Sequence, residues 1–137
     1  MSASTPIEGL EFDWYAVDDA GSLAVFATGL SGPVPPLVRS SAHEHHAISD
    51  SIEMFGWGTP EVWKSYSRLG LFAYDWHETN DCFVRVAAPT NPPPLEFARK
   101  LHRMGLLRLH LVFSETLMLE SRSVMTPNTS LERTREG

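Results

Sequence analysis

Four consecutive residues, His43-Glu44-His45-His46, are the part of the sequence closest in residue type to a metal site. Residues three apart share one face of a helix, so His43 and His46 could hold one ion together. A zinc site uses three or four converging ligands. The sequence has no HExxH motif and no paired cysteines, so we expect a solvated helix face with no metal and no cofactor. Metal binding by His43, His45 and His46 nevertheless stays open.

Cys82 and a set of aspartates are the remaining candidates for catalysis. Cys82 falls in an apolar strand pattern, where a free thiol is usually an inert hydrophobic side chain. Two carboxylates with separated pKa values can do acid–base work. The aspartates at expected turns and strand ends are Asp13, Asp18, Asp19, Asp75 and Asp81. No spacing among them specifies a carboxylate pair, so we expect Asp18, Asp19 and Asp81 to form turns and Asp13 and Asp75 to bond neighbouring backbone. The sequence identifies no catalytic residue.

Large aromatic residues are frequent for a chain of this length. Trp14, Tyr15, Tyr74 and Trp76 stand in two expected hairpins, on both faces of their strands. One helix layer cannot cover both faces. We therefore expect these four residues either to line a pocket for a small apolar or aromatic ligand or to meet a second subunit, because exposed apolar patches mark such sites. The second alternative predicts a homo-oligomer, most simply a dimer.

Two hairpins must position these residues. Residues 12–17 alternate and residues 23–28 are almost wholly apolar, which predicts antiparallel strands joined by Asp18-Asp19-Ala20-Gly21. A second pair of strands is predicted over residues 71–77 and 82–88, with a turn at residues 78–81. Both hairpins begin with an Asp-Trp pair, Asp13-Trp14 and Asp75-Trp76.

Helical patterns stand between and after the hairpins. Residues 37–55 predict a helix ended by Gly56 and Gly58, and Thr59-Pro60-Glu61 predicts the start of another. Residues 95–104 predict a short helix, and residues 107–113 a fifth strand. The order ββ-α-ββ-α-β indicates an α+β domain over residues 1–119, with a mostly antiparallel sheet of about five strands and two to three helices packed on one face. Residues 120–137 predict a flexible polar tail.

Composition excludes several functions. The chain has 137 residues, 42% of them apolar, which is typical of one globular domain. Its net charge of −6 is spread without a basic block, so we expect no nucleic-acid partner. No apolar run approaches the roughly 20 residues that span a bilayer, so we expect no membrane partner. A single cysteine and the lack of a signal-peptide pattern predict a cytoplasmic protein.

Two resemblances add context. The tail carries Pro127-Asn128-Thr129-Ser130-Leu131-Glu132-Arg133-Thr134-Arg135, which resembles the translated end of bacterial integron gene cassettes, where the reading frame runs into the recombination site. The body resembles a set of small bacterial proteins without known activity, through Phe12-Asp13-Trp14-Tyr15-Ala16-Val17-Asp18, Gly21, Gly32-Pro33-Val34-Pro35 and Tyr74-Asp75. The first resemblance implies a mobile bacterial gene. Neither implies a catalytic residue.

The sequence therefore favours a small bacterial binding or interaction protein that self-associates and is not an enzyme. Two alternatives stay open. One is a small enzyme with a histidine or carboxylate site. The other is an immunity or antitoxin-like protein, with which the acidic charge and the mobile gene are compatible.

Overall fold

A mixed β-sheet forms the centre of the protein. The computed structural model describes residues 12–104 and 106–125 and the backbone of residues 129–131. The strands are β1 (Asp13–Val17), β2 (Leu23–Ala27), β3 (Leu71–His77), β4 (Cys82–Ala87), β5 (Leu107–Leu109), β6 (Met118–Glu120) and β7 (Thr129–Leu131). The α-helices are α1 (Pro36–Arg39), α2 (Ala42–Asp50), α3 (Trp63–Arg68), α4 (Leu95–Arg103) and α5 (Ser121–Met125), and two 3-10 turns are η1 (Pro60–Val62) and η2 (Phe113–Glu115). The α+β class predicted from the sequence is confirmed.

The sheet has more strands, and a more mixed pairing, than the sequence predicts. In the described part of the chain its order is β6-β4-β3-β2-β1-β5-β7. Both predicted hairpins are present, β1 with β2 and β3 with β4. They join through a parallel pairing of β2 with β3, and β1 also pairs in parallel with β5. The reason is the long connection through α1, α2 and α3, because a crossover of that length returns the chain to the same end of the sheet.

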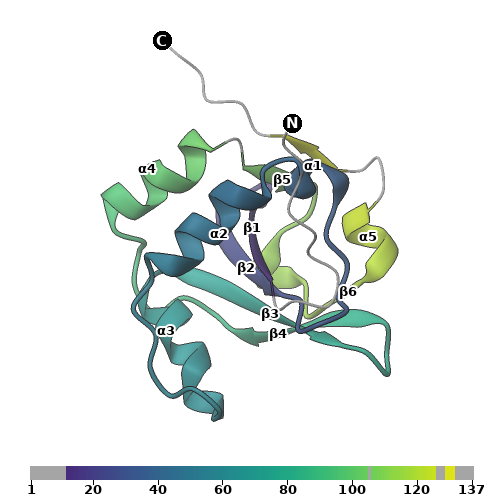
Figure 1. Ribbon diagram of the computed structural model, residues 1–137, viewed down its shortest axis with the longest axis horizontal. Coiled ribbons are helices and arrows are strands. Elements are labelled where there is room, and N and C mark those ends of the chain that lie inside the picture. The colour runs from purple at the N-terminus through teal and green to yellow at the C-terminus, as the bar shows by residue number, and fades with distance from the viewer. Residues whose placement is uncertain (1–11, 105, 126–128, 132–137) are drawn as a thin grey trace.

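Helices cover both faces of the sheet, so the prediction of helices on one face is wrong. Ile48 of α2, Tyr66 of α3 and Leu101 of α4 are buried together on what we call the three-helix face. Val38 of α1, Phe113 of η2 and Val124 of α5 are buried on the opposite side, the α5 face. Figure 1 shows α2, α3 and α4 on one side of the strands and α5 on the other. The physical cause is the central strands, whose alternate residues are apolar in both directions.

Several element boundaries differ from the sequence patterns. The helix predicted over residues 37–55 is divided into α1 and α2, because Ser41 has non-helical angles (φ −122°, ψ 26°). The predicted end at Gly56 is wrong, since α2 ends at Asp50 and the chain turns at Ser51. The predicted start at Thr59 is confirmed: its side-chain oxygen accepts a hydrogen bond from the Glu61 N–H. The fifth strand ends at Leu109, because the following residues turn back to bond the β1–β2 turn.

The predicted tail divides into a packed part and a part outside the described residues. Glu120 ends β6, and Val124 of α5 is fully buried on the α5 face. The backbone of β7 pairs antiparallel with β5. The rest of the cassette-like string, residues 127–128 and 132–135, lies outside the described residues. In the described part of the chain no helix has the length and apolar character to cross a bilayer.

Candidate functional site

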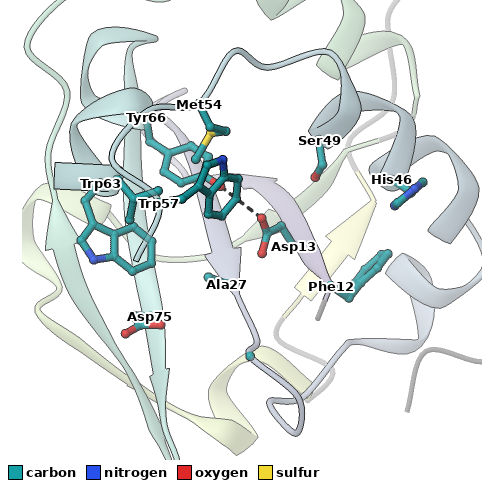
Figure 2. Close-up of a pocket in the computed structure, with 12 residues that line it drawn as sticks. Phe12, Asp13, Ala27, His46, Ser49, Met54, Trp57, Trp63, Tyr66 and Asp75 are labelled. Atoms are coloured by element: carbon teal, nitrogen blue, oxygen red, sulfur yellow. Dashed lines mark hydrogen bonds between the residues drawn. The ribbon is translucent and has the colours of Figure 1, made fainter. Parts of the chain in front are cut away.

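A cavity of about 300 Å³ lies on the three-helix face, at one end of the central strands β1, β2 and β3. The loop between α2 and α3 and the helix α3 form its other side (Figure 2). The lining residues are Phe12, Asp13, Ala27, Gly29, His46, Ser49, Met54, Trp57, Val62, Trp63, Tyr66 and Asp75. Most of them are apolar or aromatic, and two are carboxylates.

Strand register places the two carboxylates on the floor of this cavity. Asp13 of β1 pairs with Ala27 of β2, and Ala27 pairs in turn with Asp75 of β3. Residues paired across neighbouring strands point to the same face. Two strand spacings separate the Cα atoms of Asp13 and Asp75, which amounts to about 10 Å. The small side chain of Ala27 leaves the space between them open.

Asp13 is oriented by a tyrosine. The hydroxyl of Tyr66, from α3, donates to Oδ2 of Asp13 at 3.1 Å. Burial raises the pKa of Tyr66 well above its ordinary value, and the charge of Asp13 raises it further. The phenol therefore keeps its proton at every physiological pH and stays a donor to the carboxylate.

Asp75 has a different environment, since it is half-buried. Burial raises the pKa of Asp75 above its ordinary value, whereas the charge of His77 and the N–H of Trp76 act in the opposite direction. One carboxylate is thus bonded to a phenol and the other is partly removed from water. Two carboxylates in unlike environments suit acid–base chemistry, and carboxylates beside aromatic rings also suit a bound cation.

The opposite wall is aromatic. Trp63 and Tyr66 lie with ring centroids 6.0 Å apart and their planes tilted by 34°. Trp57 stands on the loop before α3 and is 71% exposed. An indole so exposed on a single domain is unusual, because burial of its large apolar surface would be favourable.

The loop that carries Trp57 is held by its own bonds. Gly56 and Gly58, on either side, have φ values of +74° and +82°, which other residues adopt only under strain. A Cβ on Gly56 would stand 2.7 Å from Cβ of Glu61. The N–H and the hydroxyl of Thr59 both donate to the carbonyl of Gly56, at 3.0 and 2.8 Å. The two glycines and these hydrogen bonds therefore fix the conformation of the turn that carries Trp57.

The aromatic residues predicted from the sequence to bind a ligand lie elsewhere. Trp14, Tyr15 and Tyr74 are fully buried, and Trp76 is half-buried. Trp14, Tyr74 and Trp76 pack on the α5 face, where Phe26 stacks between Trp14 (4.2 Å) and Tyr74 (4.9 Å). Tyr15 packs on the opposite, three-helix face. The structure does not bring the four together, and none of them lines the cavity.

Sequence reasoning named Asp13 and Asp75 among five candidate aspartates but did not single them out as a pair that shares one cavity. Side chains alternate along a strand, so a tryptophan in the core on one face places its preceding aspartate on the other. The repeated pair was the signal that could have located the cavity. The exposed Trp57 between two glycines was a second signal.

The three histidines of the 43–46 segment separate on α2. His43 and His46 are exposed, and His46 reaches the rim of the cavity, where its Nε2 lies 3.4 Å from Asp50. His45 is 1% exposed, and its Nδ1 accepts a hydrogen bond from the Tyr15 N–H at 3.1 Å. Burial lowers the pKa of His45 to about 4. Among the described residues, no three His, Cys, Asp or Glu side chains gather in a group that could hold a metal ion.

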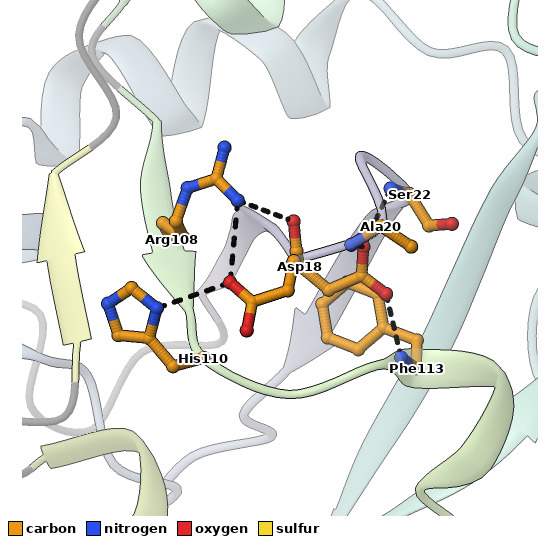
Figure 3. Close-up of polar contacts among 7 residues, drawn as sticks. Asp18, Ala20, Ser22, Arg108, His110 and Phe113 are labelled. Atoms are coloured by element: carbon orange, nitrogen blue, oxygen red, sulfur yellow. Dashed lines mark hydrogen bonds and ion pairs between the residues drawn. The ribbon is translucent and has the colours of Figure 1, made fainter.

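Another aspartate, Asp18, holds the β1–β2 turn, as Figure 3 shows. Oδ1 of the fully buried Asp18 accepts from the N–H groups of Ala20 (3.0 Å) and Ser22 (2.7 Å), and Oδ2 accepts from the Phe113 N–H (2.7 Å). The more exposed Asp19 lies 3.2 Å from Nδ1 of His110 and 3.5 Å from Nη1 of Arg108. The expected turn role of Asp18 is confirmed.

Asp81 and Cys82 have local roles. Asp81 occupies the turn between β3 and β4 with φ +53°, a conformation that aspartate tolerates. Cys82 is buried in β4, as the apolar strand pattern predicts. Comparison of the chain with protein families, curated proteins and solved structures found no match, so the functional inference rests on the geometry of the cavity.

Proposed function

We propose that the protein is a binding protein whose ligand occupies the cavity above Asp13, Ala27 and Asp75. The observation that carries this proposal is the exposure of Trp57 on a loop shaped by two left-handed glycines. Ordering two glycines has an entropic cost, and an indole held in water gains no free energy from burial. A group that covers the ring would offset this cost. A ligand in the cavity supplies that cover.

The size and lining of the cavity favour a small molecule. About 300 Å³ is at the lower end of the range for ligand pockets. Such pockets combine mostly apolar walls with a few polar groups that fix orientation. Here Met54, Val62 and the aromatic rings supply the walls, while Asp13 and Asp75 supply the polar groups.

Indole N–H signals in ¹⁵N NMR test this proposal, because the four tryptophans divide evenly. Trp57 and Trp63 line the cavity, whereas Trp14 and Trp76 pack on the α5 face. In a screen of small neutral, cationic and anionic compounds, we expect ligands to shift the signals of Trp57 and Trp63 and to leave that of Trp14 in place. A screen whose binders all leave Trp57 and Trp63 unshifted contradicts the proposal.

A floor substitution gives a second test. Ala27→Val adds two methyl groups between the carboxylates and suits a strand, so we expect a folded protein that no longer binds. Ala88→Val makes the same change at an exposed position outside the cavity and should bind as the wild type does. Equal binding by both variants would place the ligand elsewhere.

Self-association is a second candidate property, and a different surface now favours it. The expected reason was an uncovered sheet face, but the helices cover both faces. On the edge strand β6 and beside it, Leu117 is 63%, Met118 57% and Met125 40% exposed. An edge strand with apolar side chains is a template for pairing with another chain.

Molar mass in solution tests this candidate. We expect a dimer for the wild type and a monomer for Met118→Lys, because a charge on an edge strand opposes edge pairing. Leu95→Lys is the matched control, since Leu95 is 65% exposed and lies on α4, which Figure 1 shows well away from β6. A monomeric wild type would remove the proposal of self-association.

A further inference from the structure

The geometry points to a chemical class for the ligand: a small organic cation with a methylated ammonium group, held between the indoles of Trp57 and Trp63 and the carboxylates of Asp13 and Asp75. This inference rests on the proposed function and narrows it.

The charge of the lining is negative. Asp13 and Asp75 contribute two carboxylates to the floor. Among the lining residues His46 is the single basic side chain, and it stands exposed at the rim beside Asp50. The whole chain carries a net charge of −6. A negative cavity with apolar walls concentrates cations and repels anions.

The indoles of Trp57 and Trp63 line the side of the cavity away from the strands, whereas Tyr66 reaches Asp13 directly through its hydroxyl. Figure 2 shows the rings of Trp57, Trp63 and Tyr66 on the side of the loop and α3, and Asp13 and Asp75 on the side of the strands. A cation between the indoles and the carboxylates would have aromatic rings on one side and negative charges on the other. Cation–π attraction is strongest for tryptophan, and quaternary ammonium ligands are recognised in this way.

The mostly apolar lining of the cavity favours methylated ammonium groups over primary ones. A primary ammonium is compact and strongly hydrated, so entry into a mostly apolar cavity costs it much of its hydration. Methyl groups spread the charge and add apolar surface that suits Met54, Val62 and the indoles. The half-buried Asp75 supports the presence of a cation. Burial disfavours its charged form and so raises its pKa, and a cation beside the carboxylate would stabilise the charged form again.

Choline and 3,3-dimethylbutan-1-ol form a matched pair of probes. They have the same shape, but a neutral carbon replaces the charged nitrogen in the second. We expect choline to shift the indole signals of Trp57 and Trp63 and to bind at least about tenfold more tightly than the neutral compound, a difference of about 1.4 kcal/mol. Equal or tighter binding of the neutral compound overturns the inference but leaves the proposed function intact.

A result in which neither probe moves those signals also overturns the inference. The wider screen with neutral and anionic compounds then decides whether the proposed function holds. The two failures are therefore distinguishable: a neutral or anionic compound that moves the Trp57 and Trp63 signals retains the binding site and rejects the cation.

Substitutions in the floor and the wall of the cavity test which residues recognise choline. Asp75→Asn keeps the shape and removes a charge, so choline affinity should fall about tenfold while affinity for the neutral compound stays unchanged. Asp81→Asn removes the same charge at a turn outside the cavity, where asparagine adopts positive φ readily, and it should change neither affinity. Equal losses for both probes in Asp75→Asn would contradict a charge-based role.

Trp57→Leu tests the ring face separately. Because Trp57 is largely exposed, this variant should fold as the wild type does. Its choline affinity should fall roughly three- to thirtyfold, the range of cation–π contributions. Leucine keeps much of the apolar contact, so the neutral compound should lose little. A variant with unchanged choline affinity would remove Trp57 from the site.

Discussion

His45 makes the stability of this protein sensitive to mild acid. The imidazole lies within the fold, 1% exposed, and stacks on Tyr15 at 6.0 Å with a 15° interplanar angle. Its Nδ1 accepts from the Tyr15 N–H. The parallel pairing of β1 with β5 covers only Ala16 and Val17, so the histidine supplies the acceptor where the ladder stops. A protonated Nδ1 cannot accept this hydrogen bond.

The magnitude follows from the pKa. Burial lowers the pKa of His45 from 6.5 to about 4. At about 1.4 kcal/mol for each pH unit, the free energy of unfolding falls by about 3 kcal/mol. The sign follows from proton binding: below pH 6.5 the unfolded chain binds a proton that the folded chain excludes. Stability from this group is therefore complete above pH 6.5, declines as the pH falls, and reaches its full loss below about pH 4.

Urea unfolding at a series of pH values from 7 to about 4 measures this loss. His45→Asn is the informative variant, because its Oδ1 can replace Nδ1 as acceptor for the Tyr15 N–H and does not titrate. It should be less stable at pH 7, since it loses the ring contact, but its stability should fall less steeply with acid. Carboxylates contribute equally to both proteins, so the difference between the curves isolates His45.

His46→Asn serves as the control, because His46 is exposed on the same helix. Its pH profile should run parallel to that of the wild type. If wild type and His45→Asn lost the same free energy of unfolding over this window, the imidazole would not be held neutral by burial, and the role of His45 as acceptor for the Tyr15 N–H would be wrong.

Further substitutions test the core, the turn and the cavity. Trp14→Ala should lower the free energy of unfolding by about 3–5 kcal/mol, whereas Trp57→Ala, at an exposed position, should change it by less than about 0.5 kcal/mol in urea unfolding. Asp18→Ala leaves three N–H donors without their acceptor, and we expect a loss of about 3 kcal/mol or more in the same assay. Cys82 is 2% exposed, so a thiol reagent followed by mass spectrometry should modify it in urea and spare it in native buffer. Choline affinity, measured by titration, should fall as the pH is lowered through the raised pKa of Asp75, because the neutral carboxyl attracts no cation.

The hairpins could be predicted from the sequence because their signals are local. Alternation, a turn with Gly21, and apolar runs on either side predicted β1 and β2, and the predicted strand over residues 71–77 coincides with β3. The parallel pairing of β2 with β3 has no local signal. It depends on where a crossover of three helices leaves the chain, and that is decided by packing between residues far apart in the sequence.

The cavity was hidden from the sequence for a related reason. Alternation alone shows that Asp13 and Trp14 point in opposite directions, but it does not show which direction opens to solvent. That depends on α3, whose Tyr66 bonds Asp13 and whose Trp63 lines the same cavity as Ala27 and Asp75. The sequence prediction chose the tryptophan of each Asp-Trp pair as the candidate binding residue, and both Trp14 and Trp76 pack on the α5 face.

The four tryptophans therefore have two roles. Trp14 and Trp76 support the floor of the cavity from the α5 face, and Trp57 and Trp63 line the cavity itself. On the α5 face, Nε1 of Trp14 donates to the Pro33 carbonyl at 3.1 Å, and Nε1 of Trp76 donates to the Glu78 carboxylate at 2.8 Å. Glu78 also accepts from the Ser31 hydroxyl at 2.5 Å, so the loop before α1 is fixed beneath the same strands whose other face carries the two carboxylates. Because rings and hydrogen bonds hold the floor from behind, Asp13 and Asp75 keep their separation whether or not the cavity is filled. A floor that is organised before the ligand arrives lowers the entropic cost of binding.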